Sequence, residues 1–305
     1  MKQQTKYFIF VLTLIPGLAF SQQDKPLPII DVHYHTYTGK IFFERSDGGK
    51  MVKLGPITKQ ETLREGVEVV RKHNIYAITS GPSPDLVDEW VAADPDRFIP
   101  ALQVPNARLD KAYLDMIRSR AKVGKLKVLG EVALQYEGIK PNDPVYDVYF
   151  NLAVELDLPI AVHLGPGPLP VLNIRPAYRV GAGDPLLLEE VLQRYPKLRV
   201  YIMHAGWPYL DNMMAILYTY KNVYVDLSDI TTAQTEAEYY RYLKALVDAG
   251  FGDRIMFGSD PWENAVTEFV TTAIDRVNAA DFLSTKQKRD IFYNNAARFF
   301  RIADW

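Results

Sequence analysis

The chain has 305 residues, a formal net charge of −2 and no cysteine. A near-neutral charge without a lysine or arginine run excludes the electrostatic footprint of a nucleic-acid-binding protein and favours a small-molecule substrate. The lack of cysteine excludes a thiol nucleophile, a disulfide framework and a thiolate-bound zinc, so any metal must be held by nitrogen and oxygen atoms.

The first segment has the features of a secretory signal peptide. Lys2 and Lys6 precede an apolar run over residues 7–20, and polar residues follow Ser21. The run is shorter than the roughly 20 apolar residues that a spanning helix needs. We therefore expect a signal peptide over residues 1–21, a mature domain over residues 22–305, no stable membrane span, and an exported protein that is periplasmic or secreted. An uncleaved N-terminal anchor is the alternative.

Short apolar strands alternate with amphipathic helices along the rest of the chain. The pattern predicts eight strands, over residues 28–33, 75–80, 97–104, 128–133, 160–163, 199–203, 223–227 and 254–258. Helix start signals occur at Thr58 and Glu61, Ser83-Pro84, Asp143-Pro144 and Asp184-Pro185, and further helices are expected over residues 110–122, 209–220, 236–249, 263–278 and 285–300. Eight strand–helix units predict a single-domain α/β fold, the closed (β/α)8 TIM barrel, rather than an open doubly wound sheet.

Two connections are longer than the rest, over residues 36–57 after the first strand and residues 165–184 after the fifth. Long loops in a compact domain are commonly functional. Both follow carboxyl ends of strands, where barrel active sites are built. Prolines follow the glycines near residue 165, so this segment cannot open a phosphate-binding helix and is expected to shape a pocket.

Rare polar residues fall at or near the carboxyl ends of five predicted strands. They are His33 and His35 on the first strand, Glu131 on the fourth, His163 on the fifth, His204 on the sixth and Asp260 on the eighth. Residues i and i+2 of a strand point to one side, so His33 and His35 can share an ion. Imidazoles with carboxylates suit zinc, manganese, iron or nickel. Hydrogen-bonded core histidines would explain one or two of these positions, but not a ligand type at so many strand ends.

One histidine falls outside this pattern. His73 follows Arg71 and Lys72 at the end of a predicted helix. A cation there complements the helix dipole, so His73 is expected to be structural.

The joint pattern resembles the amidohydrolase superfamily. The order is HxH after strand one, histidine after strands five and six, and aspartate after strand eight. The segments His204-Ala205-Gly206 and FGSDPW at residues 257–262 are similar to the amidohydrolase-related (amidohydrolase 2) branch, which includes decarboxylases and lactone hydrolases. The resemblance covers nearly the whole mature chain.

The resemblance implies a ligand set. His33, His35, His163 and Asp260 would hold a divalent metal, and His204 would be either a second-metal ligand or a catalytic proton carrier. Glu131 resembles the carboxylate that bridges two ions in two-metal members, whereas mononuclear decarboxylase-type members usually lack it. The resemblance allows either one ion or two, and zinc is the metal expected before the others.

The resemblance also implies a metal-dependent hydrolase that attacks an amide, lactone or ester carbonyl, with Asp260 and His204 as catalytic residues. The alternative is a lyase, such as a decarboxylase or hydratase. A third hypothesis is a non-catalytic binding protein. No GxSxG elbow supports a serine hydrolase. Substrate contacts are expected from Arg175, Tyr178, Arg179, Trp207 and Trp262, although the arginines would also suit solvent or a subunit interface. Asp226 and Asp229 are weaker candidates, and a homo-oligomer is left open.

Overall fold

The structure is a computed structural model that describes residues 26–38, 45–47, 50–52, 58–104, 108–167, 171–262 and 265–302. The predicted signal peptide over residues 1–21 lies outside the described residues. Within the described ranges, no helix is long and apolar enough to cross a membrane.

Eight parallel strands form a nearly closed barrel, which confirms the predicted TIM-barrel fold. In spatial order they are β1 (Ile29–His35), β4 (Ile75–Ser80), β5 (Phe98–Val104), β6 (Val128–Val132), β7 (Ile160–His163), β8 (Val200–Met203), β9 (Val223–Asp226) and β10 (Ile255–Met256). Two backbone hydrogen bonds join the first strand to the segment just after the last one, from Val32 N to Phe257 O and from Asp260 N to His33 O, each 2.9 Å long.

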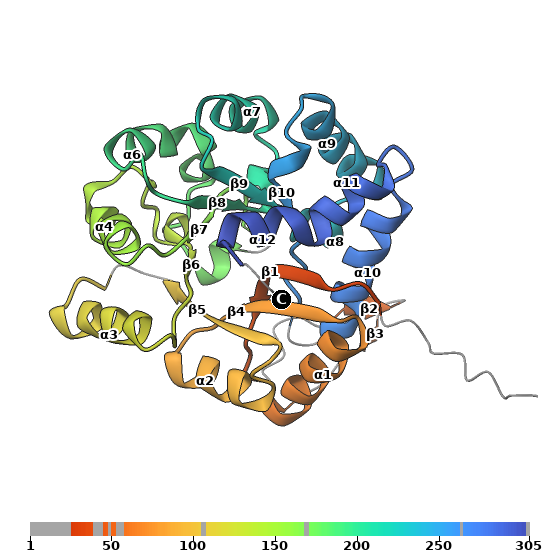
Figure 1. The fold of residues 1–305 in the computed structure, drawn as a ribbon, viewed down its shortest axis with the longest axis horizontal. Coiled ribbons are helices and arrows are strands. Elements are labelled where there is room, and N and C mark those ends of the chain that lie inside the picture. Colours follow the sequence, from red (N-terminus) through yellow and green to blue (C-terminus); the bar gives the residue numbers. More distant parts are fainter. Residues whose placement is uncertain are drawn as a thin grey trace, which may run out of the picture.

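Helices surround the strands as a ring (Figure 1). They are α1 (Lys59–Lys72), α2 (Pro84–Ala93), α3 (Lys111–Lys122), α4 (Asp147–Glu155), α5 (Val171–Ile174), α6 (Glu189–Arg194), α7 (Leu210–Thr219), α8 (Ile230–Ala233), α9 (Glu236–Asp248), α10 (Val266–Ala279), α11 (Thr285–Arg289) and α12 (Asn295–Phe300).

The predicted start signals have local physical causes that the structure confirms. Thr58 and Glu61 form a reciprocal capping box at α1, and the Ser83 hydroxyl caps α2 just before its Pro84. Asp143 and Asp184 instead cap short 3₁₀ turns that lead into α4 and α6. These caps satisfy amide groups that would otherwise lack partners at the helix ends.

Apolar side chains fill the barrel interior and the layer between strands and helices. The interior holds a cluster of buried side chains, among them Ile30, Val32, Ala161, Tyr201 and Met203. At the amino ends of the strands, Phe299 of α12 packs against Tyr201 and closes the interior. Polar residues can therefore be gathered only at the opposite end.

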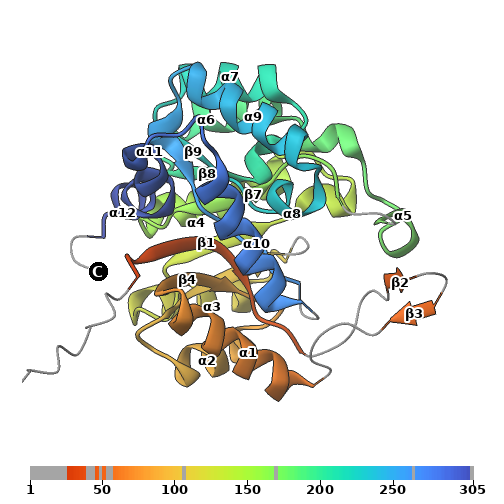
Figure 2. The ribbon, with the colours of Figure 1, turned by 90° about the vertical axis from the view of Figure 1, so that its right-hand side faces the viewer.

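The two long connections project at that opposite end. Figure 2 shows α5 and the hairpin of β2 (Arg45–Asp47) and β3 (Lys50–Val52) on the far side of the barrel from α12. The sequence pattern did not predict α5 or the β2–β3 hairpin. Both belong to loops that follow strand carboxyl ends, as expected for segments that border an active site.

Candidate metal centre

A register shift in β1 turns both histidines of the HxH motif toward the barrel mouth. Ile30 and Val32 pack in the barrel interior, whereas Tyr34 packs in the layer toward the helices. Strict alternation would place Val32 and Tyr34 on one face, and the pairing with β4 shifts register between Asp31 and Tyr34. Such irregularities re-aim side chains next to active sites. The side chains of His33 and His35 therefore point to the inner face of the barrel. Ile30 and Val32 occupy the same face closer to the amino end of β1.

A second register shift positions Glu131 on β6. The pairing of β6 with β7 is irregular between Leu129 and Val132. Gly130 lies here with φ +152°, and an added Cβ would come within 2.3 Å of the Ala161 Cβ. Only glycine allows the two strands to approach so closely. The neighbouring carboxylate of Glu131 is thereby brought against β7, which carries His163.

The first set of donor atoms comes from β1 and from the segment after β10. Nε2 of His33 and Nε2 of His35 lie 3.0 Å apart. Oδ1 of Asp260 is 3.5 Å from the first nitrogen and 3.3 Å from the second. Together these three residues form a group that is able to hold a metal ion.

The second set lies beside it, across Glu131. Nδ1 of His163 is 2.6 Å from Oε1 of Glu131 and 3.0 Å from Nε2 of His204. The other carboxylate oxygen of Glu131, Oε2, is 3.4 Å from Nε2 of His35. Glu131 therefore directs one oxygen toward each donor set, as a carboxylate shared by two ions would.

The donor atoms fit a cation better than they fit one another. Nε2 of His33, Nε2 of His35 and Oδ1 of Asp260 are electron-rich atoms that repel at these distances unless a proton or a metal lies among them. Two further buried atoms of the cluster, Nε2 of His163 and Oδ2 of Asp226, have no hydrogen-bond partner among the described residues. Buried polar groups of this kind are normally paired or bound to metals.

Burial and mutual charge perturb most groups of the cluster. Burial opposes protonation of His33, but Asp260 and Asp226 outweigh it and raise its pKa to about 10. Burial lowers the pKa of His35 and of His163. Burial alone would raise the pKa of Glu131, but the hydrogen bond from His163 and the nearby imidazoles hold that pKa well below its ordinary value. Burial raises the pKa of Asp260 despite the two histidines beside it. Such concentrated perturbation is typical of a functional site.

Backbone conformation adds an independent sign of function. His204, Ala205 and Asp260 adopt φ values of +58°, +49° and +44°. Non-glycine residues with positive φ are uncommon, and each costs about 1–3 kcal/mol. Strain of this kind persists where the surrounding structure holds side chains in place, and here it falls on two of the predicted site residues.

Two residues of the cluster were given too little weight in the sequence: Asp226 was only a weaker candidate for a substrate contact, and Ser228 was not singled out. Asp226, which ends β9, is fully buried and lies 3.3 Å from Nδ1 of His33 through its Oδ2. The hydroxyl of Ser228 lies 2.7 Å from Nδ1 of His33 and 3.1 Å from Nδ1 of His204. The signal that could have found them is a pair of polar residues, two apart, at the carboxyl end of an apolar strand.

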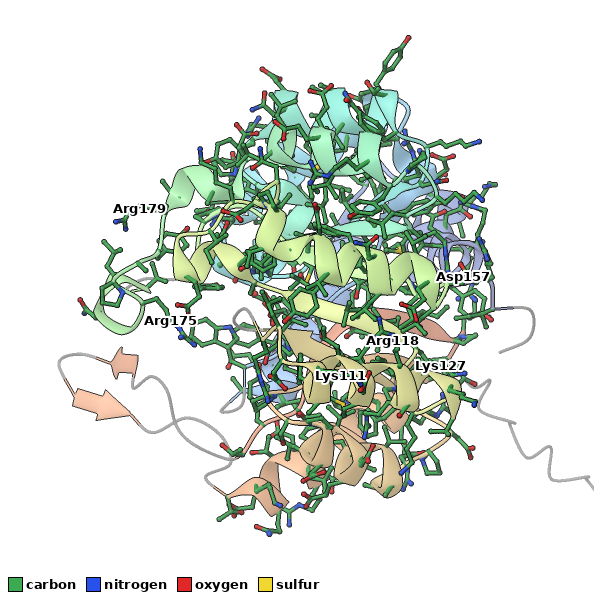
Figure 3. All side chains as sticks on the ribbon, turned by 90° about the vertical axis from the view of Figure 1, so that its left-hand side faces the viewer. Lys111, Arg118, Lys127, Asp157, Arg175 and Arg179 are labelled. Atoms are coloured by element: carbon green, nitrogen blue, oxygen red, sulfur yellow. The ribbon has the colours of Figure 1, made fainter. Side chains whose placement is uncertain are left out.

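The predicted substrate arginines differ in their surroundings. Figure 3 shows Arg175 and Arg179 near the projecting α5 segment, at the opposite end of the molecule from Lys127 and Asp157. The Arg175 guanidinium is 3.2 Å from the Glu137 carboxylate, and both side chains are partly exposed. The Arg179 guanidinium donates to three backbone oxygens of its own loop, at residues 176–178. Arg179 is thus engaged within its loop, whereas Arg175 bridges two loops of the site end.

The predicted aromatic contacts lie around the same end. The Tyr178 hydroxyl accepts a hydrogen bond of 2.6 Å from Gly167 N, and its ring contacts Tyr136. The ring centroids of Tyr136 and His163 are in turn 5.0 Å apart. The Trp207 indole donates to Glu238 of α9 at 2.8 Å, and the Trp262 ring stacks on Phe269 of α10. The rings therefore join the site loops to the surrounding helices.

Other features lie apart from the cluster. His73 caps the end of α1, as predicted, but burial lowers its pKa, which disfavours the expected cation. A cavity of about 920 Å³ is lined by Lys127, Asp157 and Phe300 among others, at the α12 end. The buried imidazoles and carboxylates lie at the other end of the strands.

The fold and the site define a TIM barrel with buried metal-binding groups at the carboxyl ends of its strands. Residues 30–302 match the family model described as amidohydrolase, so the chain belongs to this family. This confirms the resemblance seen in the sequence. No curated protein matches the chain.

Solved structures share the fold at low sequence identity. A probable 2-pyrone-4,6-dicarboxylic acid hydrolase from Acinetobacter baumannii, with citric acid bound, is 15% identical with a TM-score of 0.62 over 90% of this chain and 100% of that chain. A 2,6-dihydroxybenzoate decarboxylase from Rhizobium is 16% identical with a TM-score of 0.61, over 91% and 99%. A 5-carboxyvanillate decarboxylase from Novosphingobium aromaticivorans, complexed with manganese, is 16% identical with a TM-score of 0.59, over 92% and 97%. Structures with this fold thus include proteins named as a hydrolase and as decarboxylases.

Proposed function

We propose that the chain is a metal-dependent hydrolase that attacks the carbonyl of an amide, lactone or ester in a small molecule, with two divalent ions in its centre. The observation that carries this proposal is the position of Glu131. Its Oε1 lies 2.6 Å from Nδ1 of His163, and its Oε2 lies 3.4 Å from Nε2 of His35. A carboxylate divided in this way suits a pair of ions, and paired ions suit hydrolytic displacement.

The proposed ligands divide into two sets. His33, His35 and Asp260 would hold one ion, His163 and His204 would hold the other, and Glu131 would bridge them. The nitrogen and oxygen donors suit zinc first, with manganese, iron or nickel as alternatives. A bound divalent ion would supply Lewis acidity, which acidifies water and polarises a carbonyl group.

The chain itself would orient the substrate and accept the proton of the attacking water. Oδ1 of Asp260 lies beside both Nε2 atoms of the HxH motif, so this carboxylate can serve the ion and also act as general base. Arg175 would face a substrate carboxylate from the loop after β7, and Tyr178, Trp207 and Trp262 would line the mouth. Arg179 would act through the loop that it stabilises.

A lyase is the second candidate function. The solved structures with the same fold include decarboxylases of aromatic acids. The partly exposed Arg175, which is able to pair with a carboxylate, is equally suited to such a substrate. The number of ions separates the candidates, because the proposed hydrolase needs the second donor set as a metal site.

The metal content of the purified protein tests the proposal. We expect elemental analysis to give close to two equivalents in the wild type and about one in Glu131→Gln. Glu137→Gln is the matched control, because it removes a nearby carboxylate that pairs with the partly exposed Arg175. The same three proteins are then assayed with lactones and amides, and with aromatic carboxylic acids for release of carbon dioxide.

Each outcome has a clear meaning. Two equivalents together with hydrolysis of a lactone or amide support the hydrolase. One equivalent, unchanged in Glu131→Gln, together with release of carbon dioxide would replace it with the lyase. Failure to bind any divalent metal under loading conditions would overturn both functions.

We also propose that the chain is exported to the periplasm or secreted. The support is the charged and then apolar pattern of residues 1–21. N-terminal sequencing of the protein from the fraction outside the cytoplasm is expected to begin near residue 22. A sequence that begins at Met1, or its recovery only from the cytoplasm, would contradict export with cleavage.

A further inference from the structure

A buried carboxylate lies directly beneath the candidate metal centre. Asp226 is fully buried at the end of β9. Its Oδ1 accepts hydrogen bonds from the backbone N–H groups of His204 and Ser228, each 3.0 Å long, and from the Ser228 hydroxyl. Its Oδ2 makes no hydrogen bond among the described residues and lies 3.3 Å from Nδ1 of His33.

The Ser228 hydroxyl determines which imidazole nitrogens carry protons. A hydroxyl has a single proton to donate, and here that proton goes to the Asp226 carboxylate. The Ser228 oxygen can therefore only accept from its two remaining neighbours, Nδ1 of His33 at 2.7 Å and Nδ1 of His204 at 3.1 Å. Both Nδ1 atoms must then be the protonated ones.

A second contact of His204 leads to the same tautomer. Its Nδ1 lies 3.3 Å from the backbone carbonyl oxygen of Ser228, which can only accept a hydrogen bond. The backbone of His204, at φ +58°, is held by its own N–H bond to Asp226. The ring and the main chain of this histidine are thus fixed by the same short segment after β9.

We infer that Asp226 and Ser228 are positioning residues that keep a proton on Nδ1 of both His33 and His204, so that in the metal-bound state both Nε2 atoms face the ion without a proton. In the metal-free protein the raised pKa of His33 gives its Nε2 a proton as well, which a bound ion would displace. In the metal-bound state this inference rests on the proposed function, because the ligand roles of the two histidines belong to it. Carboxylates and hydroxyls behind metal-ligating histidines set their orientation and basicity.

The inference changes what His204 can do in the reaction. An Nδ1–H tautomer of His204 offers a lone pair at Nε2. His204 can therefore bind an ion or accept a proton at this atom, but it cannot donate a proton from it in the resting state. Of the two roles left open by the sequence, ligand and proton carrier, the second would have to begin with proton uptake.

Asp226→Asn is the most informative change. The three donors around Oδ1 will retain the amide oxygen at that position, which turns the amide nitrogen toward Nδ1 of His33. An N–H group would then oppose an N–H group, and His33 would be driven to carry its proton on Nε2 instead. We expect zinc affinity to fall by about 10- to 100-fold, the range found for partners of metal-ligating residues.

Asp31→Asn is the matched control. Asp31 is also fully buried, on β1, and accepts from His33 N, Ser259 N and the Ser259 hydroxyl. Its carboxylate contacts no imidazole ring in these bonds, and the Ser259 hydroxyl can rotate to accept from an amide. We expect the zinc affinity of Asp31→Asn to stay within about threefold of the wild type. The zinc affinity of Asp226→Asn should fall by about 10- to 100-fold.

The tautomers can be read directly by two-bond ¹H–¹⁵N correlation spectra of protein labelled at histidine nitrogen. Among the five histidines, His73 lies outside the site and serves as an internal reference. We expect Nδ1–H signals for His33 and His204 in the zinc-loaded wild type, and a shift of the His33 proton to Nε2 in Asp226→Asn. Signals are assigned with single His33→Gln and His204→Gln variants.

Ser228→Ala covers the case in which Asp226→Asn fails to fold. It removes the hydroxyl acceptor but leaves Asp226 beside His33 and the backbone carbonyl of residue 228 beside His204. The expected loss of zinc affinity is therefore smaller, below tenfold. An Nε2–H signal from His204 in the wild type would overturn the inference, as would wild-type zinc affinity in a folded Asp226→Asn. A chain that bound no metal would overturn the proposed function alone, because the His204 tautomer can still be read in the metal-free protein.

Discussion

Glu131 and His163 face each other across the pairing of β6 with β7, with Oε1 of the first 2.6 Å from Nδ1 of the second. The contact joins the two donor sets, because the other oxygen of Glu131 is directed toward His35. Gln103 of β5 also donates to Oε2 of Glu131, at 3.2 Å. The orientation of one carboxylate therefore depends on three neighbouring parts of the barrel, and changes to the strand pairing at this point are expected to be costly.

Gly130→Ala is expected to destabilise the fold. The added Cβ would lie 2.3 Å from the Cβ and 2.9 Å from the carbonyl oxygen of Ala161, and φ is +152°. Overpacking of a well-packed core costs about 1–3 kcal/mol, and backbone strain adds a similar amount. We expect the free energy of unfolding, measured by urea denaturation, to fall by about 3 kcal/mol.

Gly181→Ala provides the control for this change. Among the described residues, no heavy atom beyond Gly181 and its two chain neighbours lies within 4 Å of the position of an added Cβ at Gly181. Its stability is expected to match that of the wild type or to rise slightly, because alanine lowers the entropy of the unfolded chain. Equal stability of the two alanine variants would contradict the tight approach of β6 to β7.

Asp260→Asn is expected to reduce kcat by about 10²- to 10⁴-fold, the usual contribution of a general base. The fold should survive, because asparagine tolerates the positive φ of +44° at this position and the backbone bond to His33 is retained. Asp229→Asn is a matched comparison, since Asp229 is also an aspartate at positive φ, +56°. Steady-state kinetics should show a loss below tenfold for Asp229→Asn, and similar losses for the two variants would argue against a special role of Asp260.

The sequence predicts the barrel well because its signals are local. The strand at residues 75–80 and the strand at residues 160–163 have the predicted bounds, and the capping box of Thr58 and Glu61 forms as expected. Side-chain period, helix caps and turn residues each act over a few neighbours. A pattern repeated eight times therefore specifies the architecture without knowledge of distant contacts.

The internal arrangement of the site depends on contacts that no local pattern contains. The register shifts around His33 and Glu131 arise from pairing with neighbouring strands. Asp226 ends a run of strand residues and looks like an ordinary strand end. Its contact with His33 arises only because the barrel closes and brings the end of β9 near β1, across the intervening β10. The sequence therefore predicts which residues gather, but not which nitrogen of each histidine faces the others.

The stability contributed by Glu238 is expected to depend on pH. Its bonds with Arg241 and with the Trp207 indole lower its pKa from 4.5 to about 2. A carboxylate whose pKa is depressed on folding contributes stability above its unfolded pKa, and this contribution is lost as the pH falls toward the folded pKa. The difference in unfolding free energy between the wild type and Glu238→Gln should be constant above about pH 5.5 and should shrink between about pH 5 and pH 2. Urea denaturation of metal-free protein checks this, and a difference that is independent of pH would contradict it.

Arg175→Met is expected to weaken the binding of substrates that carry a carboxylate. The Arg175 guanidinium reaches Glu137 at 3.2 Å and remains partly exposed, so a ligand carboxylate can compete for it. Hydrogen bonds to charged groups contribute about 1.5–3 kcal/mol, which corresponds to roughly a 10- to 100-fold rise in KM. An uncharged analogue of the same substrate should show little change, because a lost charge pair affects only the charged ligand.

Arg179→Met separates a substrate contact from a loop support. Its guanidinium donates to the backbone oxygens of residues 176–178, so its loss should loosen the loop and lower the thermal midpoint. The ratio of KM values for the charged substrate and its uncharged analogue should then be unchanged in Arg179→Met but should approach one in Arg175→Met. An unchanged ratio in Arg175→Met would remove Arg175 from the substrate site, whereas a changed ratio in Arg179→Met would return Arg179 to it.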